Sequence, residues 1–194
     1  MGVRTKRRTV HLTEAKQLRA LAHPMRLRLL GLLRSDGPAT ATALAARVDA
    51  SVPLISYHLR QLGAHGFVEE ADELAHDGRE RWWRALHQMT SWDVGEFLDS
   101  PGRLAAGRAL SAEVAHRYTE VLEAWVAEMP ELPREWVGVS EMSDWRLELS
   151  PDELAELRRQ LSGVVERFAD RPQREGTEPI TAIVQLLPRP RPTR

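Results

Sequence analysis

The chain has 194 residues, of which 42% are hydrophobic and 28% charged, an ordinary balance for a globular protein of one or two domains. It contains no cysteine, which excludes disulfides, thiolate metal sites and thiol redox sensing. No run reaches the ~18 apolar residues of a membrane span, and the first residues lack the apolar stretch of a secretory signal, so we expect no membrane partner and a cytoplasmic location.

The net charge of −1 hides an asymmetry. Residues 1–90 hold 14 Lys and Arg against 9 Asp and Glu, a balance of +5, whereas residues 91–194 hold 13 against 19, a balance of −6. A basic half joined to an acidic half suggests that one part meets a polyanion and the other has a different task.

The first third of the chain predicts a basic arm and three helices. Residues 1–11 are basic and lack apolar periodicity, so we expect a flexible arm. Three helical segments follow it: 13–23, 24–35 and 40–48. Thr13 is the expected cap of the first, Pro24 suits the first turn of the second, and Thr40 or Thr42 caps the third.

A fourth helix and a hairpin come next. Only Asp49 and Ala50 separate the third helix from a helix over residues 51–65, so the two must cross at a steep angle. After Gly66, the segments "FVEEADE" and "RERWWRAL" have strand character and flank a turn at Asp77–Gly78. This order of elements predicts a winged helix-turn-helix DNA-binding domain over residues 12–90.

The helix 51–65 has two distinct faces. At 100° per residue, Ile55, Leu59 and Leu62 form a buried stripe, and the opposite face carries no acidic residue, as a helix facing phosphates requires. The DNA-facing residues expected on this helix are Ser51, Pro53, Ser56, Tyr57, Arg60 and Gln61. The alternative is a merely solvated surface helix.

His58 lies nearer the buried side of the same helix, so we interpret it as a structural histidine rather than a ligand.

The segments "LRALAHPMRLRLLGLL", "TALAARVDASVPLISYHLRQLGAHGFVE" and "GRERWWRAL" resemble the ArsR-type winged-helix regulators, most of all their metal-independent relatives. The resemblance covers about residues 13–90. It implies a homodimer that reads a pseudo-palindromic operator, and a wing whose Arg79 and Arg81 contact phosphates or the minor groove. The alternative for these two arginines is a solvated hairpin tip.

The founding members of that family sense metals through cysteines, which this chain lacks. Glu113, His116 and Glu120 share one helical face, but a solvated face is the better interpretation of such spacing. We therefore expect no metal and no cofactor.

Residues 91–129 are expected to form a helical dimerisation region: a short helix capped by Ser91, then a long helix from Leu104 to Met129. Its apolar residues recur every three or four positions, namely Leu110, Val114, Tyr118, Val121 and Trp125. Such a stripe suits packing against a symmetry mate.

Residues 130–188 predict a small strand–helix–strand domain. "WRLELS" alternates, Ser150 and Glu153 form a capping box, and "ITAIVQLL" reads as a buried strand before a disordered tail at 189–194. So small a unit needs a partner surface, in its own chain or a second one. The predicted fold class is therefore α+β: mainly helical, with small β elements.

Four tryptophans of the acidic half are a candidate effector pocket for a small organic molecule: Trp92, Trp125, Trp136 and Trp145. We favour the alternative that they are core and interface filler.

The function expected from these features is a dimeric, sequence-specific DNA-binding transcriptional regulator, a repressor if it follows the family's usual mode. The expected partners are double-stranded DNA, a second copy of the chain and a small-molecule effector. The alternative is a winged-helix module that binds a protein partner instead of DNA. An enzyme is disfavoured, because the chain has no phosphate-binding glycine loop, nucleophile motif or cluster of metal ligands.

Overall fold

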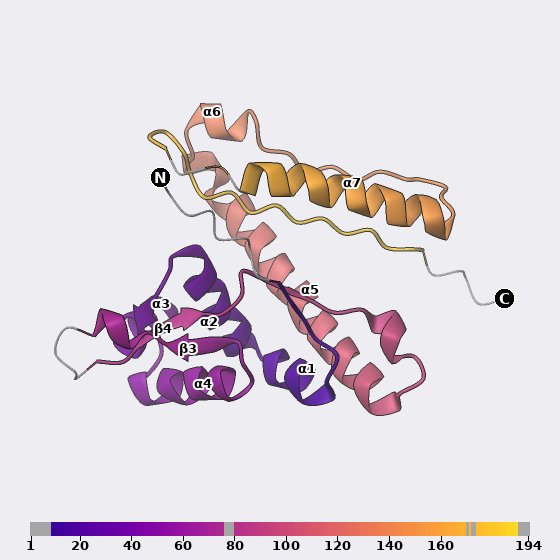
Figure 1. Ribbon diagram of the computed structural model, residues 1–194. Coiled ribbons are helices and arrows are strands. Elements are labelled where there is room, and N and C mark those ends of the chain that lie inside the picture. The colour runs from indigo at the N-terminus through magenta and orange to yellow at the C-terminus, as the bar shows by residue number, and fades with distance from the viewer. Residues whose placement is uncertain (1–8, 76–79, 170, 172–173, 190–194) are drawn as a thin grey trace. The chain divides into compact units, whose positions relative to one another are not determined.

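The structure, a computed structural model, describes residues 9–75, 80–169, 171 and 174–189 (Figure 1). The chain divides into two compact units, Met1–Ala127 and Glu128–Arg194, which are described separately. The helices are α1 (Ala15–Leu21), α2 (Pro24–Ser35), α3 (Ala41–Val48), α4 (Val52–Ala64), α5 (Pro101–Glu128), α6 (Arg134–Val137) and α7 (Pro151–Ala169). The strands are β1 (Thr9–His11), β2 (Ala39–Thr40), β3 (Val68–Glu70), β4 (Trp82–Ala85) and β5 (Met89–Ser91). Short 3-10 turns are η1 (Asp72–Leu74), η2 (Val94–Phe97) and η3 (Met129–Glu131).

Local signals account for most helix starts in the first unit. The Thr40 side chain accepts a hydrogen bond from the amide of Ala43 at 3.2 Å, as one of the two predicted caps of α3. Pro24 occupies the first turn of α2, where the His23 ring accepts from the amide of Met25. The prediction of Thr13 as cap of α1 is wrong: Glu14 holds the cap position, and its side chain makes no cap hydrogen bond.

The α3–α4 joint depends on one backbone conformation. Asp49 has φ of 52°, in the left-handed region, and it is the only residue other than glycine with positive φ in the described part of the chain. Its amide donates to the carbonyl of Ala45, which ends α3. The chain can then start α4 two residues later, so the predicted tight turn is confirmed.

Two small sheets join segments that are distant in sequence. Strands β2, β4 and β3 form an antiparallel sheet in that order, with Ala39 opposite Trp83 and Glu69 opposite Arg84. Strand β1 pairs in parallel with β5. The prediction of a flexible arm is therefore wrong for residues 9–11, because these residues form backbone hydrogen bonds with β5. Leu12, which follows them, is fully buried. The arm residues Arg4, Lys6, Arg7 and Arg8, like the Asp77–Gly78 turn, lie outside the described residues.

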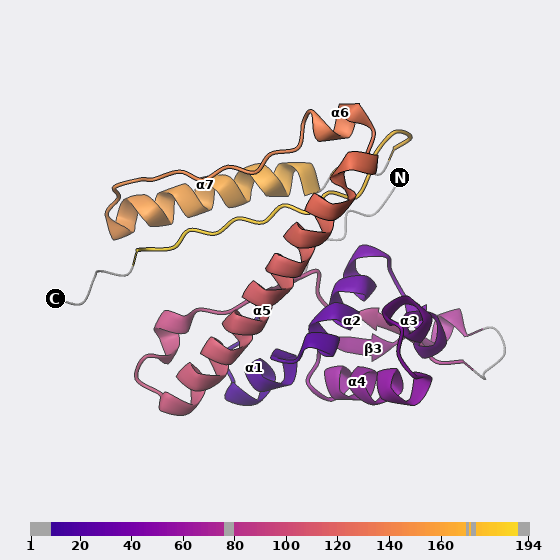
Figure 2. The same ribbon diagram turned by 180° about the vertical axis from the view of Figure 1, so that it is seen from behind.

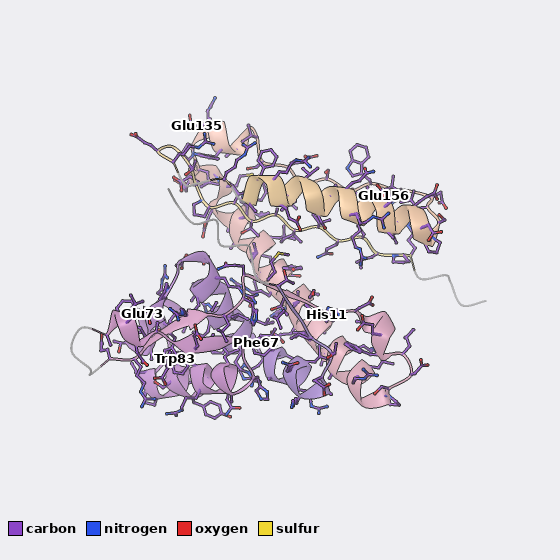
Figure 3. The ribbon with its side chains drawn as sticks, viewed as in Figure 1. His11, Phe67, Glu73, Trp83, Glu135 and Glu156 are labelled. Carbon is purple, nitrogen blue, oxygen red and sulfur yellow. The ribbon has the colours of Figure 1, made fainter. Side chains whose placement is uncertain are left out.

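The core of the first unit lies where α1–α4, the β3–β4 hairpin and the start of α5 meet. Figures 1 and 2 show α2, α3 and α4 gathered around the small sheet, in which α4 contacts β3, α2 contacts β4 and α3 contacts β2. Ile55, Leu59 and Leu62 of α4 are all 0% exposed, so the predicted buried stripe is confirmed. Phe67, labelled in Figure 3, and Phe97 are the largest fully buried side chains.

Arg34 joins α2 to β5 and to the segment that precedes it. Its guanidinium donates to the carbonyl of His87 at 2.8 Å and to the Thr90 hydroxyl at 2.7 Å. Burial lowers the pKa of Arg34 to about 10. Arg34 therefore stabilises the fold, and its guanidinium is occupied by these internal hydrogen bonds.

The connection to α5 differs in detail from the prediction. Ser91 ends β5 and is not a helix cap; the cap of η2 is Asp93, whose carboxylate accepts from the amide of Gly95 at 2.8 Å. Pairing with β1 holds Ser91 in extended conformation, so the turn starts later. The long helix α5 begins at Pro101, three residues before the predicted Leu104, and ends at Glu128.

The second unit forms the predicted helix but not the predicted strands. Ser150 and Glu153 make both capping-box hydrogen bonds, at 2.7 and 3.3 Å. Residues 145–149 and 180–187 run extended without strand assignment, since a strand requires a hydrogen-bonded partner. No described residue of this unit is buried. In the described parts of both units, no helix is long and apolar enough to cross a lipid bilayer.

Candidate DNA interface

Helix α4 exposes the residues predicted to face DNA. Pro53, Tyr57 and Arg60 are exposed, with Tyr57 at 51%, while Ser56 and Gln61 are half-buried. Ser51 at the cap position is exposed, and its side chain makes no cap hydrogen bond. Its hydroxyl and the first amides of α4 are therefore available to an external acceptor such as a phosphate.

A hollow of about 310 Å³ brings α4 together with the wing. It is lined by Thr40, Ala41, Thr42, Val52, Ser56, Arg60, Glu80, Arg81 and Trp83. Two of the predicted residues of α4, Ser56 and Arg60, thus share one concave surface with Arg81 of the wing. Trp83 is one of the lining residues, and its indole packs closely against Gly63. A Cβ added at Gly63 would lie only 3.3 Å from this indole.

The wing arginines are partly engaged within the hairpin. Arg81 pairs with Glu70 at 3.0 Å and remains 70% exposed, and Arg79 lies outside the described residues. Arg84, across the strand from Glu69, donates to that carboxylate at 2.7 Å and also pairs with Glu73. The hydrogen bond to Glu69 raises the pKa of Arg84. Arg84 therefore fixes the hairpin, and Arg81 is the described arginine of the wing that points to the hollow.

His58 is 5% exposed, in agreement with its interpretation as a structural residue. Its ring lies 4.6 Å from that of His23 and 5.3 Å from that of Tyr57, between centroids. Burial, then the charges of His23 and Arg26, lower the pKa of His58. The His23 contact could not be predicted from the sequence, because His23 caps α2 and His58 lies 35 positions later in α4.

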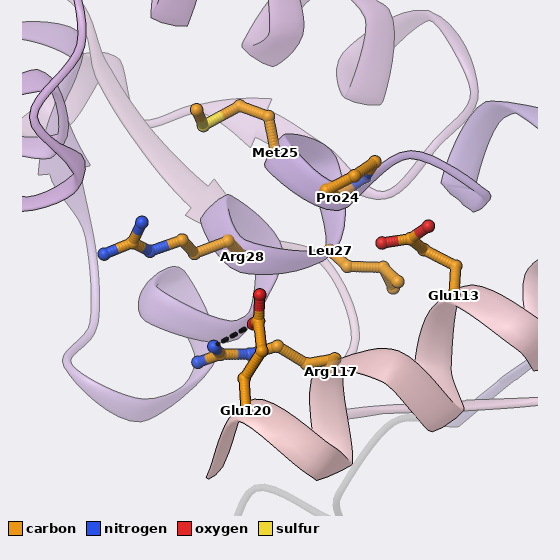
Figure 4. A pocket seen from close by; sticks show the side chains of 7 residues that line it. All are labelled: Pro24, Met25, Leu27, Arg28, Glu113, Arg117 and Glu120. Carbon is orange, nitrogen blue, oxygen red and sulfur yellow. Dashed lines mark hydrogen bonds and ion pairs between the residues drawn. The ribbon is translucent and has the colours of Figure 1, made fainter. Parts of the chain in front are cut away.

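A second, smaller hollow of about 120 Å³ lies between α2 and α5 in the first unit (Figure 4). Its lining includes Glu113 and Glu120, two of the three residues weighed as a metal site. Glu120 bonds to Arg117 at 2.8 Å and lies 3.6 Å from His116. Among the described residues, no three His, Asp or Glu side chains gather as a metal site would need.

The structure does not gather the tryptophans of the first unit. Trp92 packs against the core and donates to the Ser111 hydroxyl at 3.1 Å. Trp125 lies 14 residues beyond Ser111 in α5, a distance of about 21 Å along the helix axis at 1.5 Å per residue. In the second unit, Trp136 is half-buried and Trp145 is 79% exposed. None of the four lines either hollow described above.

Comparison with known proteins identifies the domain. A family described as a helix-turn-helix domain matches residues 21–71, which run from α1 through β3. A solved structure described as a possible transcriptional regulator for arsenical resistance is 34% identical, over 58% of this chain and 95% of that one, with a TM-score of 0.32. Among curated proteins, none matches this sequence.

Two further solved structures are more distant. The homodimeric winged helix-turn-helix domain of a possible ArsR-family regulator from Mycobacterium bovis is 18% identical, over 68% of this chain and 86% of that one, with a TM-score of 0.33. A mutant of ZitR from Lactococcus lactis in its apo form is 14% identical, over 76% and 83%, with a TM-score of 0.33.

The superpositions are too loose to carry weight, so the assignment rests on the residues that the helix-turn-helix family matches. The observed order of elements, four helices followed by the β3–β4 hairpin, agrees with this match. The chain carries a helix-turn-helix domain with a β-hairpin wing, and it is a DNA-binding transcriptional regulator.

Proposed function

We propose that this regulator reads a specific operator with α4 in the major groove and with the wing on the backbone or in the minor groove. The observation that carries the proposal is the exposed face of α4, which has no acidic residue and shares a hollow with Arg81. DNA repels carboxylates and attracts arginine, so such a face suits the groove.

Each side chain has a chemical role on this proposal. Ser51 and the first amides of α4 donate to a phosphate. Arg60 bonds a guanine edge or a phosphate, while Ser56, Tyr57 and Gln61 reach neighbouring base edges. Arg81 exchanges Glu70 for a phosphate, and Arg79 is proposed as a further contact to phosphates or the minor groove.

A homodimer is the proposed binding unit. Leu122 and Val126 of α5 are exposed apolar side chains, and Val121 and Trp125 beside them are half-buried. A helix with such a stripe gains stability from a second copy. The dimer would present two α4 helices to half-sites about 34 Å apart, one turn of DNA. Leu122→Glu is expected to shift the protein to monomer in sedimentation equilibrium.

We further propose that binding represses transcription and that a small organic effector, bound by the C-terminal half of the chain, modulates it. Support comes from the presence of a second unit that DNA contact by α4 does not need. If tryptophan fluorescence and melting temperature stayed unchanged across a broad panel of metabolites, the effector proposal would fail.

A gel-shift titration on the protein's own promoter region, at several salt concentrations, tests the DNA placement. Arg60→Ala is expected to weaken specific binding about tenfold or more, because a bidentate guanine contact is worth about 1–3 kcal/mol. Arg158→Ala, an exposed arginine of α7, removes the same charge as a matched control and should change little. Salt-independent binding, or no specific binding at all, would favour the alternative of a protein partner.

A further inference from the structure

Two aliphatic side chains of α4 are exposed although the helix buries a separate apolar stripe. Val52 is 40% exposed and Leu54 is 43% exposed, in the first turn of the helix. No earlier turn covers them, and neither contributes to the core. Exposed apolar surface costs free energy in water, so a ligand that covers it would gain affinity.

The two side chains flank the polar face rather than forming one patch. Val52 lines the hollow together with Ser56, Arg60 and Arg81. Leu54 lies on the other flank, about 20° around the helix from Gln61 at 100° per residue. Since the polar face separates them, they offer two isolated apolar contacts, and a protein partner would instead require a contiguous apolar surface.

The major groove of DNA offers a matching apolar group. The C5-methyl of thymine is the apolar feature that base pairs present there, beside the acceptors and donors that polar side chains read. Arg60 and Arg81 provide the positive charge that draws the phosphates on either side. The helix α4 itself carries no acid, and Glu80 of the wing is the one carboxylate among the residues that line the hollow. The surroundings of Val52 and Leu54 thus suit nucleic acid.

We propose that Val52 and Leu54 each contact a thymine methyl group, so that every operator half-site carries A·T pairs at two positions near the N-terminus of α4. The inference rests on the proposed placement of α4 in the major groove, and it names part of the sequence that the protein selects.

Deoxyuridine substitution tests the proposal, because it removes the methyl and keeps the Watson–Crick edge and O4. Each thymine of a footprinted half-site is replaced in turn, and dissociation constants are measured for the wild-type protein. Replacement at two positions is expected to weaken binding about three- to tenfold, as for one or two buried methyl-sized groups. Deoxyuridine outside the half-site is the control on the DNA.

Variants assign each methyl to its side chain. Val52→Ala should lose affinity for the thymine operator yet show no further loss at one of the two deoxyuridine positions, and Leu54→Ala should behave likewise at the other. Both residues are exposed, so folding should survive, and a melting curve checks it. The wild-type deoxyuridine series stands independently of any variant.

The outcomes separate the two levels of proposal. If deoxyuridine changed nothing while Arg60→Ala abolished specific binding, the methyl contacts would be refuted and the groove placement of α4 would stand. If neither change mattered, the placement itself would be wrong. Losses that were identical in wild type and in both alanine variants would assign the methyls to other side chains and overturn the roles of Val52 and Leu54.

Discussion

Helices α4 and α7 have similar apolar stripes, but only the stripe of α4 is buried. Every stripe residue of α4 is fully buried, whereas α7 buries none of its side chains, and Val164, Val165 and Phe168 are exposed. The helix α4 packs against α2, α3 and β3, which together form layers around a core. In the second unit, no strand is assigned to the extended segments on either side of α7 in the chain. A 3.6-residue period shows which face of a helix must be buried, but it does not show which other segment packs against that face.

Truncating one leucine in each helix tests this comparison most directly. Leu59→Ala is expected to lower the free energy of unfolding by about 2–5 kcal/mol, since it leaves a cavity in a packed core. Leu157→Ala should cost less than about 1 kcal/mol, because its side chain is only half-buried. Urea denaturation followed by circular dichroism measures both. Equal losses would mean that the stripe of α7 is covered in solution.

A pair of glycines gives a second contrast. A Cβ at Gly107 of α5 would lie 2.9 Å from the Phe97 ring, so Gly107→Ala should destabilise the first unit by about 1–3 kcal/mol. A Cβ at Gly163 of α7 meets nothing within 4 Å, so Gly163→Ala should stabilise its helix by up to about 1 kcal/mol. Thermal melts of the two variants decide. A destabilising Gly163→Ala would reveal a close neighbour on α7.

Among the described residues, Asp49 is the only residue other than glycine whose backbone lies in the left-handed region. Asp49→Val should cost about 1–2 kcal/mol, because a β-branched side chain is strained at positive φ. Asp49→Gly should stay within about 1 kcal/mol of wild type and serves as the control. Since this turn orients α4, we expect Asp49→Val to weaken operator binding in a gel shift as well. Unchanged stability in both variants would show that the turn relaxes freely.

The smallest expected effect is a pH dependence of the first unit. Burial lowers the pKa of both His58 and His23, with the charge of Arg26 acting in the same direction and Glu113 opposing it at His23. The unfolded chain therefore binds protons more readily near its usual histidine pKa of about 6.5. The contribution of the two histidines to the free energy of unfolding should be fully present above that pH and should decline as the pH falls below it. Melting temperatures from pH 7.5 to 5 should decline less steeply for His58→Gln, and an unaltered profile would contradict the assignment.

Local patterns were enough to predict the helices and the hairpin of the DNA-binding region. The stripe of Ile55, Leu59 and Leu62, the cap at Thr40 and the capping box of Ser150 and Glu153 depend on residues within a few positions of one another. Strands β1, β2 and β5 were missed, because segments of two or three residues become strands only through partners far along the chain. The same reason explains Ser91, which pairing with β1 removes from its predicted cap position.

The sequence by itself determined the helix-turn-helix domain, the polar face of α4 and the apolar face of α7 that needs a packing partner, since these follow from residue type and period. Tertiary structure alone decided that Arg81 shares a hollow with Ser56 and Arg60, that Arg34 and Arg84 are structural, and that His58 stacks near His23. Which arginine is free for DNA and which holds the fold depends on long-range neighbours. Residue type is local, whereas the partner of a charge is a property of the packed chain.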